Sequence, residues 1–208
     1  MFDLISHLTE KGIQHTVSDN GHITVGDGLN LRDTSITALP DNLSVGGWLD
    51  LRDTGITTLP DNLSVGGYLD LSGTGITTLP DNLSVGGYLD LSGTPITALP
   101  DNLSVGGWLD LRYTRITALP EKFTCLALYL DPERISNIAY RKGCGRLDRT
   151  VFAAWTGKEI CIAAGCFFDV LAVFERAVDI KYTGKAADDY KQAARECVAD
   201  LLKDNKNV

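Results

Sequence analysis

The sequence lacks any long hydrophobic run. Its longest apolar stretch, residues 160–174, is interrupted by Gly165 and Asp169, so it falls short of the roughly 18 consecutive apolar residues that span a membrane. The first residues carry an acid and no positive charge, which is unlike a secretory signal. We therefore expect a cytoplasmic protein with no membrane partner.

Histidine is scarce, and cysteine is absent from the front half. All three histidines lie within the first 22 residues, and the first of the five cysteines is Cys125. A cysteine nucleophile needs a nearby histidine, so a Cys–His pair is not expected. The odd number and irregular spacing of the cysteines do not indicate a disulfide framework. We therefore expect free thiols. Cys161 and Cys166 also lack a second Cys or His pair at zinc-finger spacing, so we expect these two to be buried core thiols rather than metal ligands.

Positive charge is also scarce in the front half. Residues 1–120 contain five Lys or Arg against fourteen Asp or Glu, whereas residues 121–208 contain fourteen against thirteen. Proteins that bind nucleic acid gain much of their affinity from Lys and Arg. The charge distribution therefore does not favour direct binding of nucleic acid, and it indicates a protein partner with a basic surface.

An internal repeat dominates the front half. The nine residues LPDNLSVGG begin at residues 39, 59, 79 and 99, which gives a period of 20. Altered copies cover residues 23–38 and 119–130. Within a unit, Leu49 and Leu51 alternate with Trp48, Asp50 and Arg52, as in a strand with one buried face and one solvated face.

The remaining repeat positions predict how each coil turns and packs. We expect Leu43, Val45 and Ile56, with their equivalents, to complete an apolar stack. Prolines such as Pro60 favour an extended or turn-like return. We expect the Gly-Gly pairs to supply positive backbone angles at a tight corner, and Thr54 and its equivalents to satisfy the turning backbone. The Asp-Asn pairs that follow the prolines are predicted turn residues.

The pattern L-x-L-x-x-T-x-I-x-x-L-P resembles a leucine-rich repeat of the short bacterial or bacteriophage type, with Thr where the commoner motif has Asn or Cys. The resemblance covers residues 23–130 and implies an α/β solenoid with a parallel β-sheet. It implies little about function, because proteins of this architecture share only the property of binding something. Calcium is not expected, because the calcium β-roll has a nine-residue period. We predict no cofactor and no metal.

Two caps are expected to flank the solenoid. Residues 1–22 contain a predicted capping helix from Phe2 to Lys11, which ends at Gly12. Residues 131–208 no longer show the 20-residue repeat, and their pattern predicts an α+β domain. It would contain a hairpin formed by residues 150–155 and 158–163, followed by two amphipathic helices separated near Gly184.

The outward face of the strand ladder carries the candidate binding residues. The period places aromatic, acidic and Arg/Ser side chains in three neighbouring columns. Stacked carboxylates repel one another by about 1 kcal/mol per neighbour even in water, so this array favours a cationic partner that also contacts the aromatic rings. The predicted partner-binding residues are Trp48, Tyr68, Tyr88, Trp108, Asp50, Asp70, Asp90, Asp110, Arg52 and Arg112. A structural alternative is that the rings stiffen the ladder and the arginines neutralise the acids.

We expect a non-enzymatic protein-interaction module. Specifically, we expect a phage- or pathogen-encoded inhibitor in the host cytoplasm that masks a basic surface of a host defence or DNA-handling protein. One alternative is an acidic mimic of nucleic acid. Another is a cysteine-dependent enzyme around Cys161 or around Cys144. Four basic residues near Cys144 form either an activating environment or a solvated loop: Arg141, Lys142, Arg146 and Arg149. Self-association through the C-terminal domain is a further alternative.

Overall fold

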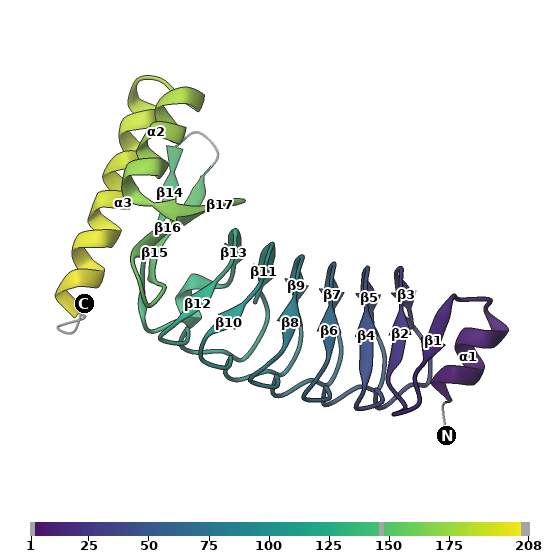
Figure 1. The fold of residues 1–208 in the computed structure, drawn as a ribbon. Helices are drawn as coiled ribbons and strands as arrows, with labels where there is room; N and C mark the ends of the chain where they lie inside the picture. Colours follow the sequence, from purple (N-terminus) through teal and green to yellow (C-terminus); the bar gives the residue numbers. More distant parts are fainter. Residues whose placement is uncertain (1–2, 146–147, 205–208) are drawn as a thin grey trace.

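The 20-residue repeat folds into a coil with two short parallel strands, one on each side of the Gly-Gly corner. The computed structural model describes residues 3–145 and 148–204. Successive coils stack so that each adds one strand to each of two sheets. The result is an elongated solenoid with a second unit at its C-terminal end (Figure 1). The predicted fold class is confirmed as a parallel β-solenoid whose 20-residue coils carry leucine at the strands, with a cap at each end.

The strands before the corner form the first sheet. Its order is β1 (His15–Val17), β2 (Ile23–Val25), β4 (Leu43–Val45), β6 (Ser64–Val65) and β8 (Ser84–Val85). A bridge between Val85 and Val105 links this sheet to the pair β10 (Leu103–Ser104) and β12 (Phe123–Thr124). Each parallel pair of β2, β4, β6 and β8 joins residues that are twenty positions apart.

The strands after the corner form the second sheet. Its six strands are β3 (Leu29–Asn30), β5 (Leu49–Asp50), β7 (Leu69–Asp70), β9 (Leu89–Asp90), β11 (Trp108–Asp110) and β13 (Ala127–Tyr129). The register of twenty holds from β3 to β11. In the last coil the corner is one residue shorter, so Trp108 pairs with Ala127. Each outward position of the repeat therefore forms a column across the sheet.

The core is the stack of inward apolar side chains. Leu43, Val45, Leu49, Leu51 and Ile56 are buried, as are their equivalents in the following coils. This confirms the inward stack predicted from the alternation. The threonine prediction is also confirmed, because the Oγ1 of each repeated Thr donates a hydrogen bond to the carbonyl three residues earlier. The five residues are Thr34, Thr54, Thr74, Thr94 and Thr114, with donor–acceptor distances of 2.6–2.7 Å.

The Gly-Gly corners work differently from the prediction. None of the eight glycines in these pairs has a positive φ. They are needed because the coils approach closely: a Cβ on Gly66 would lie 2.2 Å from the carbonyl oxygen of Gly46. Positive φ occurs instead just before the repeated threonine. The residues there are Asp33, Asp53, Gly73, Gly93 and Tyr113.

The N-terminal cap consists of a short helix and one antiparallel strand. Helix α1 (Leu4–Glu10) begins at Asp3, whose carboxylate accepts backbone N–H groups of the first turn. It ends before Gly12, which has φ +65°, as the sequence predicts. Phe2, the first residue of the predicted helix, lies outside the described residues. Strand β1 pairs antiparallel with β2 and was not predicted.

The C-terminal unit is a four-stranded antiparallel sheet covered by two helices. Its order is β14 (Ile138–Cys144), β15 (Arg149–Trp155), β16 (Ile160–Ala164) and β17 (Phe167–Val170), followed by α2 (Leu171–Lys181) and α3 (Lys185–Asp204). The β15–β16 hairpin and the two helices agree with the prediction. Strands β14 and β17 were missed, and the predicted loop around Lys142 belongs to β14. A 3-10 turn, η1 (Pro132–Arg134), precedes this sheet.

The two faces of the C-terminal sheet pack against different partners. On one face, Phe152 and Phe168 join the core of the solenoid, and Phe168 stacks on Phe123 of β12 with ring centroids 6.1 Å apart. On the other face, Val151 and Ile162 pack against α2 and α3. Because side chains alternate along each strand, one face of the sheet packs on the last coil and the opposite face is covered by the helices. None of the helices in the described parts of the chain is long and apolar enough to cross a membrane.

Candidate partner-binding face

Four aromatic rings form a continuous stack on the outward face of the second sheet. We call Trp48, Tyr68, Tyr88 and Trp108 the aromatic ladder. Ring centroids are 5.5 Å apart between Trp48 and Tyr68, 4.5 Å between the two tyrosines, and 6.0 Å between Tyr88 and Trp108. The first two pairs are almost parallel, at 8° and 3°. The parallel register thus brings together the four aromatic residues that the sequence predicts.

The ladder differs between its two ends. In the first coil its position is occupied by Gly28, and the indole of Trp48 lies so close that a Cβ there would be 2.0 Å from it. At the other end Ala127 takes the position, so Trp108 is 54% exposed and Tyr88 is 36% exposed. Leu126, on the neighbouring corner, is also exposed. The C-terminal end of the ladder is therefore an apolar, solvent-facing surface.

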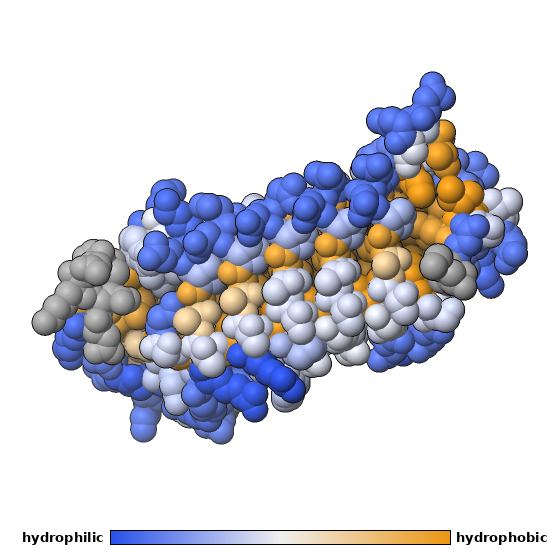
Figure 2. Space-filling view, turned by 90° about the horizontal axis from the view of Figure 1, so that it is seen from below, coloured by the Kyte–Doolittle hydropathy of each residue, from blue (hydrophilic) through white to orange (hydrophobic). Residues whose placement is uncertain are grey.

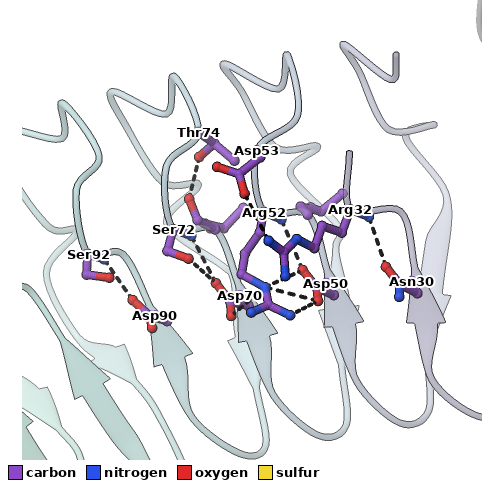
Figure 3. A network of polar contacts seen from close by, with 12 residues as sticks. Asn30, Arg32, Asp50, Arg52, Asp53, Asp70, Ser72, Thr74, Asp90 and Ser92 are labelled. Carbon is purple, nitrogen blue, oxygen red and sulfur yellow. Dashed lines mark hydrogen bonds and ion pairs between the residues drawn. The ribbon is translucent and has the colours of Figure 1, made fainter. Parts of the chain in front are cut away.

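Next to the ladder run four aspartates, which we call the carboxylate column: Asp50, Asp70, Asp90 and Asp110. Each Oδ1 accepts the backbone N–H of the residue two positions later, at 2.8–3.1 Å. Figure 3 shows these contacts repeating from coil to coil for the first three. The carboxylates therefore hold the chain as it leaves the strand, which is a structural role that the sequence analysis did not identify.

Arginines neutralise the two outer carboxylates of this column. Arg52 makes a two-pronged ion pair with Asp50, and its Nε also lies 3.3 Å from Asp70 Oδ2 (Figure 3). The side chain of Asp50 is only 3% exposed. Burial alone would raise the pKa of Asp50, but the hydrogen bonds and charge of Arg52 outweigh it and hold the pKa below its usual value. Arg112 pairs with Asp110 in the same way.

The two middle carboxylates have weaker partners. Asp70 accepts hydrogen bonds from the N–H and hydroxyl of Ser72. Burial nevertheless raises the pKa of Asp70, and the neighbouring charge of Asp90 adds to that rise. Within the described residues, Asp90 has no ion pair and accepts only the N–H of Ser92. Asp90 thus lacks an ion pair of its own, although the charge of Arg112 acts on it from the next coil, and it lies beside the exposed end of the ladder.

A second acidic column lies on the turns that follow the prolines. We call Asp41, Asp61, Asp81 and Asp101 the turn column; all four lie in turns, as predicted, and all four are exposed. Viewed from below, equivalent side chains line up in rows along the solenoid, with hydrophilic residues along one edge (Figure 2). These aspartates were predicted only as turn residues, yet they are more exposed than Asp50 and Asp110.

The end of the ladder meets the C-terminal unit at a hollow, which we call the elbow. It is lined by Arg112 and Tyr129 from the solenoid and by Arg149 and Cys166 from the C-terminal sheet, among others. The guanidinium of Arg112 lies 5.4 Å from the ring centroid of Tyr129, whose ring meets Trp108 edge-on at 6.1 Å. Sequence reasoning missed Tyr129. The sequence did contain a pattern that could have identified it. Leu128-Tyr129-Leu130 is a short copy of the strand motif, but it aligns with the repeat only after a one-residue deletion.

Cys161 is buried, as predicted, whereas Cys166 is exposed, so the prediction of a buried thiol was wrong there. At the other four cysteines burial disfavours the thiolate. Burial raises the pKa of Cys144, and it raises the pKa of Cys125 and Cys197 to about 12 and of Cys161 to about 11. An activated nucleophile needs the opposite shift. Arg141 is paired with Glu196 and Asp200.

Lys142 is paired with Glu133, while Arg146 lies outside the described residues. Within residues 3–145 and 148–204, no group of three or more His, Cys, Asp or Glu side chains could hold a metal ion. No protein-family model, curated protein or solved structure matches the chain.

Proposed function

We propose that the chain is a protein-binding module whose aromatic ladder and neighbouring carboxylates hold a basic surface of another protein. The observation that carries this proposal is the exposed end of the ladder. Trp108 and Tyr88 present stacked rings to solvent beside Asp90, a carboxylate without an ion pair in the described structure. Aromatic anchors next to an unpaired acid suit an arginine or lysine, which can pair with the acid and lie over a ring.

The rigidity of the face supports this role. The ladder residues are stacked on one another, and their backbone is fixed by parallel pairing on both sides. Ordered aromatic side chains lose little conformational entropy on binding, which favours them as binding anchors. The exposed turn column adds a negative field that would speed the approach of a basic partner.

The finer family assignment is also a proposal. The coil pattern resembles the short leucine-rich repeats of bacterial and bacteriophage proteins, and such solenoids present extended binding surfaces. Nearly identical coils joined to an acidic surface fit a phage- or pathogen-encoded inhibitor that covers the basic site of a host defence or DNA-handling protein. In that role the chain acts by masking a surface rather than by catalysis.

The exposed turn column favours one second candidate, a mimic of nucleic acid. In that case the carboxylates of Asp41, Asp61, Asp81 and Asp101 would take the place of phosphates. Neighbouring coils place one such charge about every 4.8 Å, whereas duplex DNA carries one charge per about 1.7 Å of its axis. Because this charge density is roughly a third of that of DNA, the aromatic face is the stronger candidate.

Affinity capture with matched variants separates the two functions. Tagged wild-type chain would be incubated with bacterial lysate at moderate salt, next to the double variant Tyr88→Ala/Trp108→Ala and the triple variant Asp61→Asn/Asp81→Asn/Asp101→Asn. The control is Tyr113→Ala, because Tyr113 is an exposed aromatic residue outside the ladder. Circular dichroism would first verify that each variant is folded.

The protein-binding proposal expects a partner that wild type and Tyr113→Ala retain and the ladder variant loses. With the purified partner, the ladder variant should bind at least about 30-fold more weakly, as for two residues at the centre of an interface. Loss in the Asp→Asn variant with retention in the ladder variant would support the mimic instead. Identical capture by all four proteins would contradict both functions.

A further inference from the structure

A small apolar hollow lies in the C-terminal unit, away from the aromatic ladder. It opens where the β16–β17 turn, the end of α2 and the beginning of α3 meet, and it measures about 170 Å³. Its apolar wall is formed by Ala164, Phe167, Phe174, Ala177 and Val178, together with the rings of Tyr182 and Tyr190. No residue of the repeat lines this hollow, although Arg149 and Cys166 line both it and the elbow.

The wall is built from side chains that are held in place. Phe167 and Phe174 meet edge-to-face with ring centroids 5.2 Å apart, and Tyr182 lies 4.9 Å from Tyr190. Tyr190 packs directly on the backbone of Gly145, where a Cβ would lie 2.2 Å from the tyrosine ring. Gly145 also has φ +65°, so its turn depends on glycine for both reasons.

Cationic groups lie at the hollow, and no carboxylate lines it in the described structure. Arg149 and Lys181 both belong to the lining. The guanidinium of Arg149 lies across Gly165, where a Cβ would be 2.6 Å from its Nη1. Arg149 has no ion pair among the described residues. An apolar hollow with an unpaired guanidinium and an ammonium group favours an anionic ligand with an apolar body.

A buried hydroxyl without a partner also points to a ligand. Tyr190 is 2% exposed, and its Oη makes no hydrogen bond in the described structure. Burial raises the pKa of Tyr190, and the charge and hydroxyl of the neighbouring Tyr182 add to that rise. The two hydroxyls are thus close, but they do not meet hydrogen-bond geometry. Buried hydroxyls are usually hydrogen-bonded, so a ligand oxygen that reached Oη would satisfy this donor.

We propose that this hollow binds a small carboxylate with a single apolar ring, of the benzoate class. An apolar cavity of about 150 Å³ holds benzene, so the ring of such a ligand fits a hollow of about 170 Å³ with an apolar wall. The planar fork of Arg149 matches a carboxylate, which it can bind through two parallel hydrogen bonds. Lys181 adds a second positive charge, and Tyr190 donates a hydrogen bond to the ligand.

Titration with benzoate tests the proposal, and benzyl alcohol serves as an uncharged ligand of similar shape. Chemical-shift changes in NMR spectra of the full chain would locate each ligand and give its affinity. We expect saturable binding of benzoate with shifts confined to residues around α2 and the β16–β17 turn, and weaker binding of benzyl alcohol. Absence of saturable benzoate binding at millimolar concentration would overturn the proposal.

Three variants separate the contributions. Arg149→Gln should weaken benzoate binding about tenfold, because it removes a hydrogen bond to a charged group, and should leave benzyl alcohol binding unchanged. Ala177→Leu fills the hollow and should abolish binding of both ligands. Tyr190→Phe should weaken benzoate binding. Arg176→Gln is the control, because Arg176 is exposed on α2 and does not line the hollow; equal effects of Arg149→Gln and Arg176→Gln would refute the proposed site.

Discussion

Replacing Gly86 by alanine tests why the coil corner requires glycine. A Cβ on Gly86 would lie 2.2 Å from the carbonyl oxygen of Gly66. It would have to withdraw by about 0.8 Å to reach 3.0 Å, below which such contacts essentially never occur. Two backbone hydrogen bonds hold this corner against the preceding coil, from Gly86 N to Val65 O at 2.9 Å and from Gly87 N to Gly67 O at 2.7 Å. The clash is with backbone, so no side-chain rotation can relieve it.

The expected cost follows from what the withdrawal breaks. Losing or stretching two backbone hydrogen bonds costs about 1 kcal/mol each. Moving the coils apart also weakens the packing of Val85 and Leu89 against the coil before them, because interiors are packed too tightly to absorb such a shift. We expect Gly86→Ala to lower the free energy of unfolding by about 3 to 5 kcal/mol, which is large for an exchange that adds one methyl group.

Gly75→Ala is the matched control on a neighbouring turn. A Cβ on Gly75 would meet the methyl group of Thr57 at 3.1 Å, and φ is not positive there, so the native backbone accepts alanine after a small adjustment. Alanine also restricts the unfolded chain, which stabilises by about 0.4 to 1 kcal/mol. We expect this variant to stay within about 1 kcal/mol of the wild type.

Urea unfolding followed by circular dichroism measures both variants. Because repeat proteins can unfold coil by coil, calorimetry should show whether the transition broadens or divides. If Gly86→Ala were as stable as Gly75→Ala, the coils would have to be free to slide apart at the corner. The close approach would then not explain the glycine pairs.

Three further substitutions have distinct expected outcomes. Thr94→Val removes the 2.7 Å hydrogen bond from a buried Oγ1 to the carbonyl of Leu91. Urea unfolding should show a free energy of unfolding lower by about 1 to 3 kcal/mol. An unchanged free energy of unfolding would contradict the role of the threonine. Tyr113→Gly should stabilise by about 1 kcal/mol in the same assay, because Tyr113 is exposed and has φ +60°. The pKa of Asp70 is raised on folding, so its ionisation opposes folding above the folded-state pKa. Asp70→Asn should therefore raise the melting temperature at pH 7, and this gain should vanish below the unfolded pKa of about 3.9; a gain that persists at pH 3 would refute the electrostatic cause.

The sequence predicted the solenoid well because its evidence was repetition. A period of 20 with alternation around Leu49 and Leu51 determines which residues face the core, and the register then follows. The roles of the corner glycines and of Asp50 could not be predicted in the same way. They depend on the distance between stacked coils and on a hydrogen bond to the residue two positions later, and neither quantity appears in a periodic pattern.

The C-terminal unit was predicted less completely because it has no repeat. Strand β14 carries Arg141, Lys142 and Gly143, which resemble a charged loop. Both of its charges are paired, however, Lys142 with Glu133 and Arg141 with residues of α3. Strand β17 leads directly into α2 without a side-chain cap, so no local signal marks its end. The hollow beside Tyr190 depends on contacts between segments far apart in the chain and was likewise not predictable.

Nearly identical coils do not have identical surfaces, and this difference decides where a partner can bind. Asp50 is buried beneath Arg52, whereas Asp90, in the same position two coils later, has a serine beside it and no ion pair in the described structure. Trp48 lies against Gly28, whereas Trp108 faces solvent. Stacking alone would give every interior coil the same environment. Two features make the coils differ: the middle coils have Ser where the outer coils have Arg, and the first and last coils have a neighbouring coil on one side only. A partner of the ladder should therefore contact its C-terminal end most strongly.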